Sequence, residues 1–259
     1  MKATALITGA SSGIGLELAR VFSRNGYNLL ITARREQRLV NLKKELEDTY
    51  QNSVTCFVSD LSEPDAPREL YNYVTSNNLP VTVLVNNAGI GDYGFFHESD
   101  WDKTAAMIDL NIRSLTHLTR LFLPDLIRKE RAYIMNVAST AAFQPGPLMS
   151  VYYASKHYVL AFSEAIANEL AGTGVTVTTL CPGPTESEFQ ERADMEKSKL
   201  FDRLPVASSE DVAEYGYKAM KKGKRVAIYG FMNKVTPQLL RFLPRRLITW
   251  ATRNIQERK

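Results

Sequence analysis

The stretch ATALITGASSGIG (residues 3–15) joins a short apolar run to a glycine-rich turn. An apolar run of this length that ends in glycine is typical of a buried strand. Gly9, Gly13 and Gly15 allow a tight turn and let a phosphate come close to the backbone. The free N–H groups of a helix that begins near Gly13 would point at that anion. The stretch therefore predicts a strand, a phosphate-binding turn and a helix, in that order.

The same alternation continues along the chain. Further apolar runs rich in Val, Ile, Leu and Thr each end in a turn or a polar cluster. Helical periodicity lies between them, as at LELARVFSRNG (16–26), where Leu16, Ala19 and Phe22 share a face. Strands that alternate with helices predict an α/β fold with a doubly wound, parallel, seven-stranded sheet between two helical layers. The expected strands are 3–8, 27–33, 53–59, 81–86, 132–139, 175–181 and 225–230.

Composition favours one domain rather than two. The 259 residues are 44% apolar and 23% charged, and no low-complexity linker divides them. We expect a single catalytic domain over residues 1–230 and a basic helical extension over 231–259. The N-terminal run is too short for a signal peptide, and no run reaches the ~18 apolar residues that span a membrane. A cytoplasmic protein is expected.

The metal-ligating residue types are sparse and scattered. Cys56 and Cys181 each sit in an apolar, strand-like run, which favours buried reduced thiols over a disulfide. The three histidines lie far apart in the sequence, and no CxxC pair occurs. We therefore predict no metal site.

Ligands of parallel α/β sheets bind at the carboxyl ends of the strands. Where an NAD site usually has an acid that bonds the ribose 2′-hydroxyl, this chain has Ala33, followed by Arg34 and Arg35. A guanidinium fits a 2′-phosphate through paired, charge-assisted hydrogen bonds, so NADP(H) is favoured. The alternative is a solvated arginine pair that opens a surface helix. Asp60, after the third run, could accept a hydrogen bond from adenine or could cap a turn.

Five motifs together resemble the short-chain dehydrogenase/reductase family, in its compact oxidoreductase branch. Their order and spacing match that family from residue 3 to about residue 230, and they are TGASSGIG (8–15), NNAG (86–89), VAS (137–139), YYASK (152–156) and CPGP (181–184). The resemblance implies a Rossmann-type fold and hydride transfer between a nicotinamide and a carbonyl/alcohol pair. The expected cofactor-binding residues are Gly9, Ser11, Ser12, Gly13, Ile14, Gly15, Arg34, Arg35, Asp60, Leu61, Asn87, Ala88, Gly89, Tyr152, Lys156, Pro182, Gly183, Thr185 and Ser187.

The resemblance also implies a catalytic set. Tyr152, four residues before Lys156, matches the family's Y-x-x-x-K pattern, whereas Tyr153 does not and is expected to pack or to line the pocket. A tyrosine with a pKa near 10 exchanges protons poorly at neutral pH. A nearby ammonium and the positive charge of an oxidised nicotinamide would lower that pKa. Ser139 is implied to hold the substrate oxygen, and Asn111 to hold a water that relays protons to Lys156.

The loops at residues 89–96, 141–150 and 188–207 should line the substrate pocket. An apolar wall suits a medium-sized ketone or aldehyde, and Arg192 could bind a carboxylate or be solvated. The helices expected at 101–129 and 151–172 resemble those by which family members pair, so a homodimer or homotetramer is expected. The predicted wall residues are Phe95, Phe143, Leu148, Met149 and Phe189.

The C-terminal extension carries a net charge of +6 and the first 230 residues carry −2, which together give the net charge of +4. From Phe231 onward there are seven Lys and Arg residues against one acid, Glu257, and the nearly neutral remainder argues against a nucleic-acid ligand. The extension reads as a helix, a break at Pro244 and a second helix. An apolar stripe, with arginines around it, consists of Leu247, Ile248, Ala251 and Ile255. It could pack on its own domain or a partner subunit, make weak contact with an anionic membrane surface through 234–259, or bind another protein.

Three functions compete. The first is an NADP(H)-dependent ketone or aldehyde reductase, or in reverse an alcohol or 3-hydroxy acid dehydrogenase. The second is a non-catalytic NADP(H)-binding regulatory protein that acts through its C-terminal tail. The third is a membrane-surface protein with incidental reductase activity. The complete set Asn111, Ser139, Tyr152 and Lys156 favours the enzyme.

Overall fold

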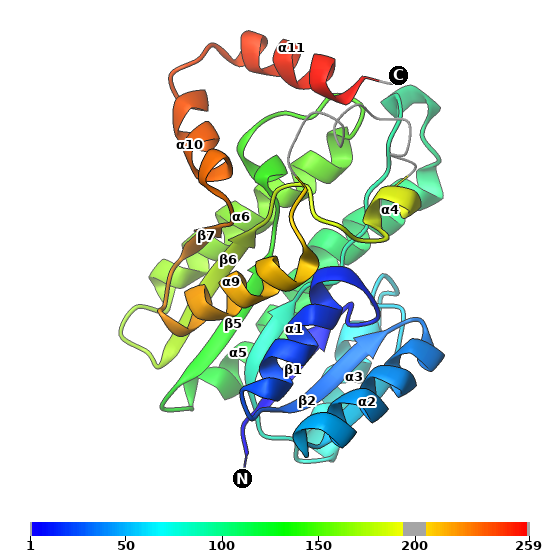
Figure 1. Ribbon diagram of the computed structural model, residues 1–259, viewed down its shortest axis with the longest axis vertical. Helices are drawn as coiled ribbons and strands as arrows, with labels where there is room; N and C mark the ends of the chain where they lie inside the picture. The colour runs from blue at the N-terminus through cyan, green and yellow to red at the C-terminus, as the bar shows by residue number, and fades with distance from the viewer. Residues whose placement is uncertain (1, 194–205, 258–259) are drawn as a thin grey trace.

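One parallel sheet of seven strands forms the centre of the computed structural model, which describes residues 2–193 and 206–257. The strand order is β3-β2-β1-β4-β5-β6-β7 (Figure 1). This confirms the predicted fold class, and the predicted strand ends lie within two residues of the observed ones. The strands are β1 (Thr4–Thr8), β2 (Asn28–Ala33), β3 (Val54–Val58), β4 (Val81–Asn86), β5 (Ala132–Val137), β6 (Val175–Cys181) and β7 (Val226–Ile228).

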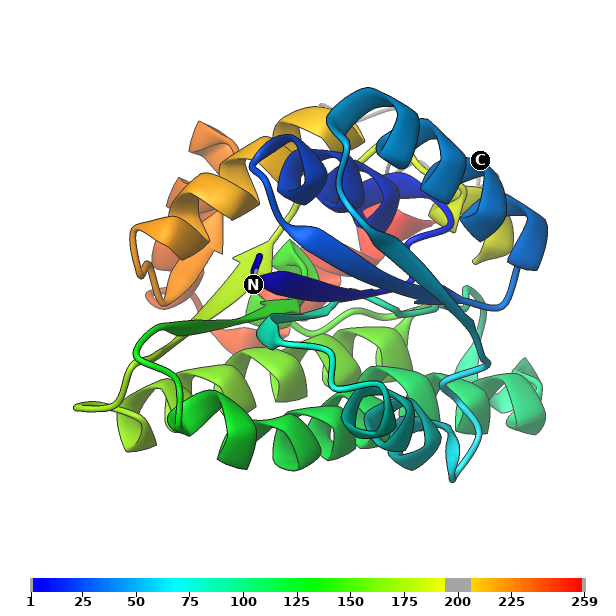
Figure 2. The ribbon, with the colours of Figure 1, turned by 90° about the horizontal axis from the view of Figure 1, so that it is seen from below.

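Helices cover both faces of the sheet (Figure 2). Successive side chains of a strand point to opposite faces, so Ala5 and Ile7 of β1 pack in one apolar cluster and Leu6 packs in another. The first cluster takes the apolar faces of α1 (Gly13–Arg24), α2 (Glu36–Tyr50) and α9 (Ser209–Lys221). The second takes those of α3 (Ala66–Ser76), α5 (Leu115–Ile127) and α6 (Ser150–Glu169). Strands covered on both sides explain the continuous apolar runs in the sequence.

The helix expected at 101–129 is present but changes its winding on the way. α4 (Trp101–Ile108) passes into a π-helical turn, η2 (Asp109–Ser114), and then into α5. Such π-turns are rare and frequently occur at functional sites. The short elements η1 (Phe96–Glu98), η3 (Thr140–Phe143) and α7 (Phe189–Arg192) lie in the loops after β4, β5 and β6.

Two helices follow the last strand, and Pro244 lies between them. α10 (Phe231–Leu240) and α11 (Arg245–Gln256) lie at the end of the molecule opposite the start of β1 (Figure 1). Ile248, Thr252 and Gln256 of α11 are buried, whereas Leu247 of the predicted apolar stripe is 47% exposed. None of the helices in the described ranges is long and apolar enough to cross a membrane. Both cysteines are free thiols, Cys181 being buried and Cys56 half-buried.

Candidate active site

The carboxyl ends of the strands surround a cleft of about 310 Å³. Every residue expected to bind the cofactor lines this cleft, and so do Ser139, Tyr152 and Lys156. Segments that follow all strands from β1 to β6 contribute to it. The parallel sheet thus brings together residues that are spread over most of the sequence.

The glycine turn at one side of the cleft is shaped for a close backbone approach. Gly9 has a φ of +69°, and a Cβ on Gly15 would stand 2.3 Å from the carbonyl oxygen of Gly9. The Asn87 amide donates to the carbonyl oxygen of Thr8 at 2.9 Å, and the Thr8 hydroxyl accepts from the backbone N–H of Ala88 at 2.9 Å. These bonds tie the turn to the end of β4. Glycine is required at both positions because a Cβ would clash with the backbone of the turn and with Asn87 and Ala88.

Arg34 and Arg35 differ in how they are engaged. Arg35 donates to the Ser11 hydroxyl at 3.0 Å and pairs with Glu188 at 2.8 Å, so it fastens the glycine turn to the loop after β6. The Arg34 side chain is 55% exposed and lies 3.4 Å from a carboxylate oxygen of Asp60. Of the two, Arg34 is the one that can turn towards an added anion.

Asp60 acts as a turn cap in this structure. Its carboxylate accepts from the Ser62 backbone N–H at 3.0 Å and from the Ser62 hydroxyl at 2.6 Å. Burial would raise the pKa of Asp60, but the hydrogen bonds from Ser62 and the charge of Arg34 outweigh burial and hold that pKa below its ordinary value. An adenine contact from Asp60 stays a prediction.

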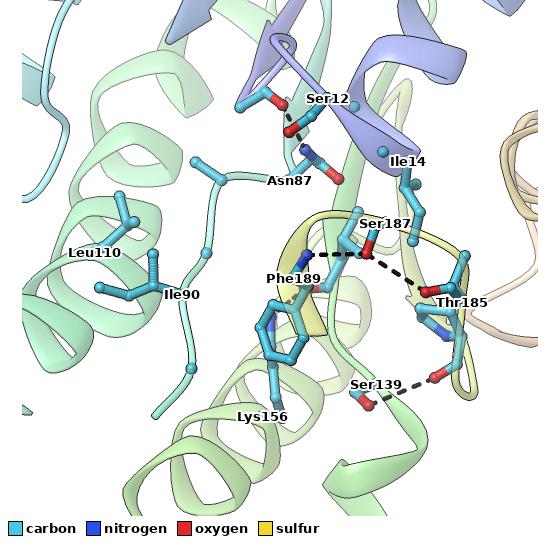
Figure 3. A pocket seen from close by; sticks show the side chains of 18 of the residues that line it. Ser12, Ile14, Asn87, Ile90, Leu110, Ser139, Lys156, Thr185, Ser187 and Phe189 are labelled. Carbon is cyan, nitrogen blue, oxygen red and sulfur yellow. Dashed lines mark hydrogen bonds between the residues drawn. The ribbon is translucent and has the colours of Figure 1, made fainter. Parts of the chain in front are cut away.

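Tyr152, Lys156 and Ser139 meet at the other end of the cleft; Figure 3 labels the last two. The Lys156 ammonium donates to the carbonyl oxygen of Val137 at 3.0 Å, and burial lowers its pKa to about 8. Burial raises the pKa of Tyr152 to about 12, and a hydrogen bond with Ser139 works in the opposite direction. The Lys156 Nζ atom lies 5.7 Å from the centroid of the Tyr152 ring. In this structure burial therefore dominates the Tyr152 pKa, and the expected lowering of that pKa by Lys156 and an oxidised nicotinamide stays a prediction.

Asn111 lies in the π-helical turn, outside the lining of the cleft and buried behind it. Its Oδ1 atom accepts from the backbone N–H of Ile90 at 3.0 Å. Its Nδ2 atom donates to the Ile90 carbonyl at 2.9 Å and to the Ser155 hydroxyl at 3.0 Å. The amide thus holds the segment after β4 against α6. Its predicted part in a proton relay stays a prediction.

Only two of the five residues predicted to form an apolar wall line the cleft. Met149 and Phe189 line the cleft, and the Phe189 ring centroid lies 5.2 Å from that of Tyr152. Leu148 packs beside them without lining the cleft. Phe143 packs in a separate cluster with residues of α6 and β7, and Phe95 lies under the Arg253 guanidinium, 4.8 Å from it, so neither lines the cleft. The Arg192 side chain and residues 194–205 lie outside the described residues.

The end of α11 reaches this part of the site, which the sequence did not indicate. Tyr93 donates its hydroxyl to the Gln256 carbonyl oxygen, and the Gln256 amide donates to the Tyr153 hydroxyl. Tyr153 lines the cleft and Gln256 is fully buried. A weak signal existed, since the spacing of four between Ile248, Thr252 and Gln256 marks an uncharged helix face.

Gln256→Leu should lower the free energy of unfolding by about 1–3 kcal/mol, because the buried tyrosine hydroxyl loses its amide partner. Urea unfolding followed by circular dichroism measures this change. The matched control is Gln238→Leu, which makes the same substitution at an exposed position of α10. Equal losses in the two variants would contradict the buried contact of Gln256.

Comparisons with known proteins agree with this geometry. The family model described as short chain dehydrogenase matches residues 3–198. The NADP-dependent 3-hydroxy acid dehydrogenase YdfG of Salmonella typhi is 35% identical over 216 residues, which are 81% of this chain and 85% of that protein. Sulfoacetaldehyde reductase 2 of Chromohalobacter salexigens is 37% identical over 81% of this chain and 84% of its own. The structure of a short-chain dehydrogenase from Sphingobium yanoikuyae in complex with NADPH superposes with a TM-score of 0.82 at 26% identity, covering 94% of this chain and 97% of that one.

Proposed function

Because this chain belongs to the short-chain dehydrogenase family, we propose that it reduces a ketone or aldehyde with NADPH, or oxidises the corresponding alcohol with NADP⁺. The family membership makes it an oxidoreductase of alcohols and carbonyls that uses a nicotinamide cofactor. One observation carries the rest of the proposal. Ser139, Tyr152 and Lys156 meet at one end of a cleft that also contains the glycine turn and Arg34.

The residues at the Tyr152 end divide the chemistry between them. A bound nicotinamide supplies or accepts the hydride at the substrate carbon. Tyr152 donates a proton to the substrate oxygen during reduction and takes it back during oxidation. The Ser139 hydroxyl, beside Tyr152, donates a hydrogen bond to that same oxygen and polarises the carbonyl. Lys156, with its low pKa of about 8, lies close enough to support the charge on Tyr152 and to bond the ribose.

The choice of NADP(H) over NAD(H) rests on Arg34. No acid takes the place after β2 that would bond a ribose 2′-hydroxyl, and Arg34 stands exposed at that edge of the cleft. A planar guanidinium can give a phosphate two parallel hydrogen bonds. The relative named as NADP-dependent and the neighbour bound to NADPH support the same choice.

Arg34→Ala should weaken NADPH binding by roughly 10–100-fold and change NADH binding little, because only NADPH carries the 2′-phosphate. Titration of nicotinamide fluorescence measures both affinities. The control is Arg38→Ala, which removes a nearby arginine of α2 that pairs with Glu188 and does not line the cleft. If Arg34→Ala leaves the NADPH affinity unchanged, the cofactor proposal is wrong.

The described part of the pocket favours an uncharged substrate. Met149, Phe189 and Ile90 contribute apolar wall to the cleft that contains Tyr152. At this end, the cation among the described lining residues is Lys156, and its ammonium already donates to the carbonyl oxygen of Val137. We therefore expect neutral ketones and aldehydes to be reduced faster than keto acids. NADPH oxidation over a panel of carbonyls tests both the reaction and this preference. Absence of turnover on every carbonyl would contradict the proposed function.

A further inference from the structure

Many large apolar side chains of α10, α11 and the turn between them are exposed to solvent. Phe242 is 86% exposed and Trp250 63% exposed. Exposed apolar patches of this kind mark interaction sites. Seven large apolar side chains of residues 231–250 are exposed, and they are Phe231, Met232, Leu239, Phe242, Leu243, Leu247 and Trp250. We call these seven residues, with the cations described next, the α10–α11 surface.

Cations are interleaved with the apolar side chains. Lys234, Arg241, Arg245 and Arg246 are all exposed, and every residue from 241 to 247 is exposed. Glu257 is the one acid among residues 231–257, and it lies 3.7 Å from Arg253. The α10–α11 surface therefore combines apolar contact area with an excess of positive charge, although Glu164 of α6 lines one hollow together with Lys234 and Arg241.

The fold does not use this apolar area for its own core. α11 packs on the domain through the opposite set of residues, Ile248, Thr252 and Gln256, and the last of these bonds Tyr153. Leu247 and Trp250 stay exposed while that face is buried. The helix is thus held in place by one side, and its other side is exposed to solvent.

We propose that the α10–α11 surface docks on an anionic lipid surface. Amphipathic helices bind there when apolar side chains enter the headgroup boundary and basic ones meet the lipid charge. Tryptophan in particular favours this boundary, where its ring is half apolar and its N–H stays hydrated. A symmetric contact with a second copy fits less well, because a two-fold interface would contain Arg241, Arg245 and Arg246 of both copies and no acid of residues 231–256 to neutralise them.

The position of the cleft agrees with such docking. α11 ends at the substrate side of the active site, where Gln256 meets Tyr153 beside Tyr152. In Figure 1, α10 and α11 lie together at one end of the molecule, away from the chain start. A lipid surface on the α10–α11 surface would therefore adjoin the substrate end of the cleft, and the proposal does not depend on which carbonyl the enzyme takes.

The tryptophan of this surface gives a direct test. The chain has two tryptophans, Trp101 and Trp250, so Trp101→Phe leaves Trp250 as the only one. Vesicles of phosphatidylcholine with about one third phosphatidylglycerol should shift the Trp250 emission to the blue and carry the protein into the pellet. Vesicles of phosphatidylcholine alone should bind far less, and salt well above physiological strength should release the protein. An unshifted emission, or equal binding to both vesicles, overturns the proposal.

Charge variants separate lipid docking from other causes. Each basic residue contributes roughly a five-fold gain in partition onto an anionic surface. The triple variant Arg241→Gln, Arg245→Gln, Arg246→Gln should therefore lose about a hundred-fold. The matched control changes three cations elsewhere, Lys43→Gln, Lys44→Gln and Lys129→Gln, and should bind like the parent. Equal losses in the two triple variants would overturn the proposal.

Two further measurements address folding and self-association. Phe242→Ser changes a side chain with little contact to the fold and should weaken vesicle binding several-fold while the thermal midpoint stays unchanged. A Trp250 emission that is already blue without lipid and shifts to the red on dilution would show a second copy on this surface. That result overturns the proposal.

Discussion

Tyr152→Phe should lower kcat for carbonyl reduction by about 10²–10⁴-fold, because the variant removes the proton donor, together with its hydrogen bond with Ser139, and leaves the ring in place. The ring keeps its contact with Phe189, whose centroid lies 5.2 Å away, so the pocket wall stays in place. The affinity for NADPH, measured by fluorescence titration, should change only a few-fold. Steady-state NADPH oxidation at the nicotinamide absorbance measures the loss of turnover.

The adjacent tyrosine provides the matched control. Tyr153→Phe removes the same atom one residue later, but this hydroxyl is held by Gln256 and its ring is buried beside Tyr152. We expect a loss in kcat of less than about ten-fold and a lower free energy of unfolding. Similar losses of kcat in both variants would contradict the assignment of Tyr152 as the acid/base.

The fold was predictable because buried parallel strands leave a local signal. β1 is buried at every residue, so the run ATALIT needs apolar or small residues throughout and stands out from the helices. The residues at the strand ends were predictable for the same reason, since the topology of the sheet fixes where strand ends meet. The chain therefore brings Gly9, Asn87, Ser139 and Lys156 to one cleft, as expected.

Long-range contacts outside the sheet left no such signal. Gln256 and Tyr153 are 103 residues apart, and nothing in either segment indicates the other. The pairing of Arg35 with Glu188 likewise depends on how the loop after β6 folds over the glycine turn. Phe95 and Phe143 were predicted to line the substrate pocket but do not, because the apolar character of a side chain does not indicate which neighbour it packs against. Phe95 packs against the guanidinium of Arg253 in α11.

Lys156→Met should abolish most turnover and yet raise the free energy of unfolding at pH 7 by about 2–3 kcal/mol. Lys156 is 6% exposed, and burial lowers its pKa from 10.5 to about 8. The folded protein therefore bears the cost of a buried ammonium at neutral pH, which methionine of similar length avoids. The lost hydrogen bond to Val137 reduces the gain. Urea unfolding at pH 7 measures the difference between the two proteins.

The pH dependence of that difference identifies its cause. Between pH 8 and pH 10.5 the unfolded chain still binds the Lys156 proton while the folded chain has released it. The unfolded state then binds more protons, so the free energy of unfolding of the parent rises with pH over this window. This gain is lost as the pH falls back through 8. Burial also raises the pKa of Cys181 and of Tyr152 to about 12, but these groups are present in both proteins and their effects largely cancel. The advantage of Lys156→Met should therefore shrink by about 3 kcal/mol between pH 7 and pH 10.5.

A surface lysine separates this effect from the general loss of a positive charge. Lys44 is exposed on α2, so Lys44→Met should leave both the stability at pH 7 and its change with pH close to those of the parent. A difference between Lys156→Met and the parent that stays constant from pH 7 to pH 10.5 would mean that the folded and unfolded chains bind the Lys156 proton equally, so that Lys156 keeps its ordinary pKa in the folded protein. The buried ammonium would then cost the fold no stability at neutral pH. A difference that shrinks as expected would show that the fold gives up stability at neutral pH to keep a charge beside Tyr152.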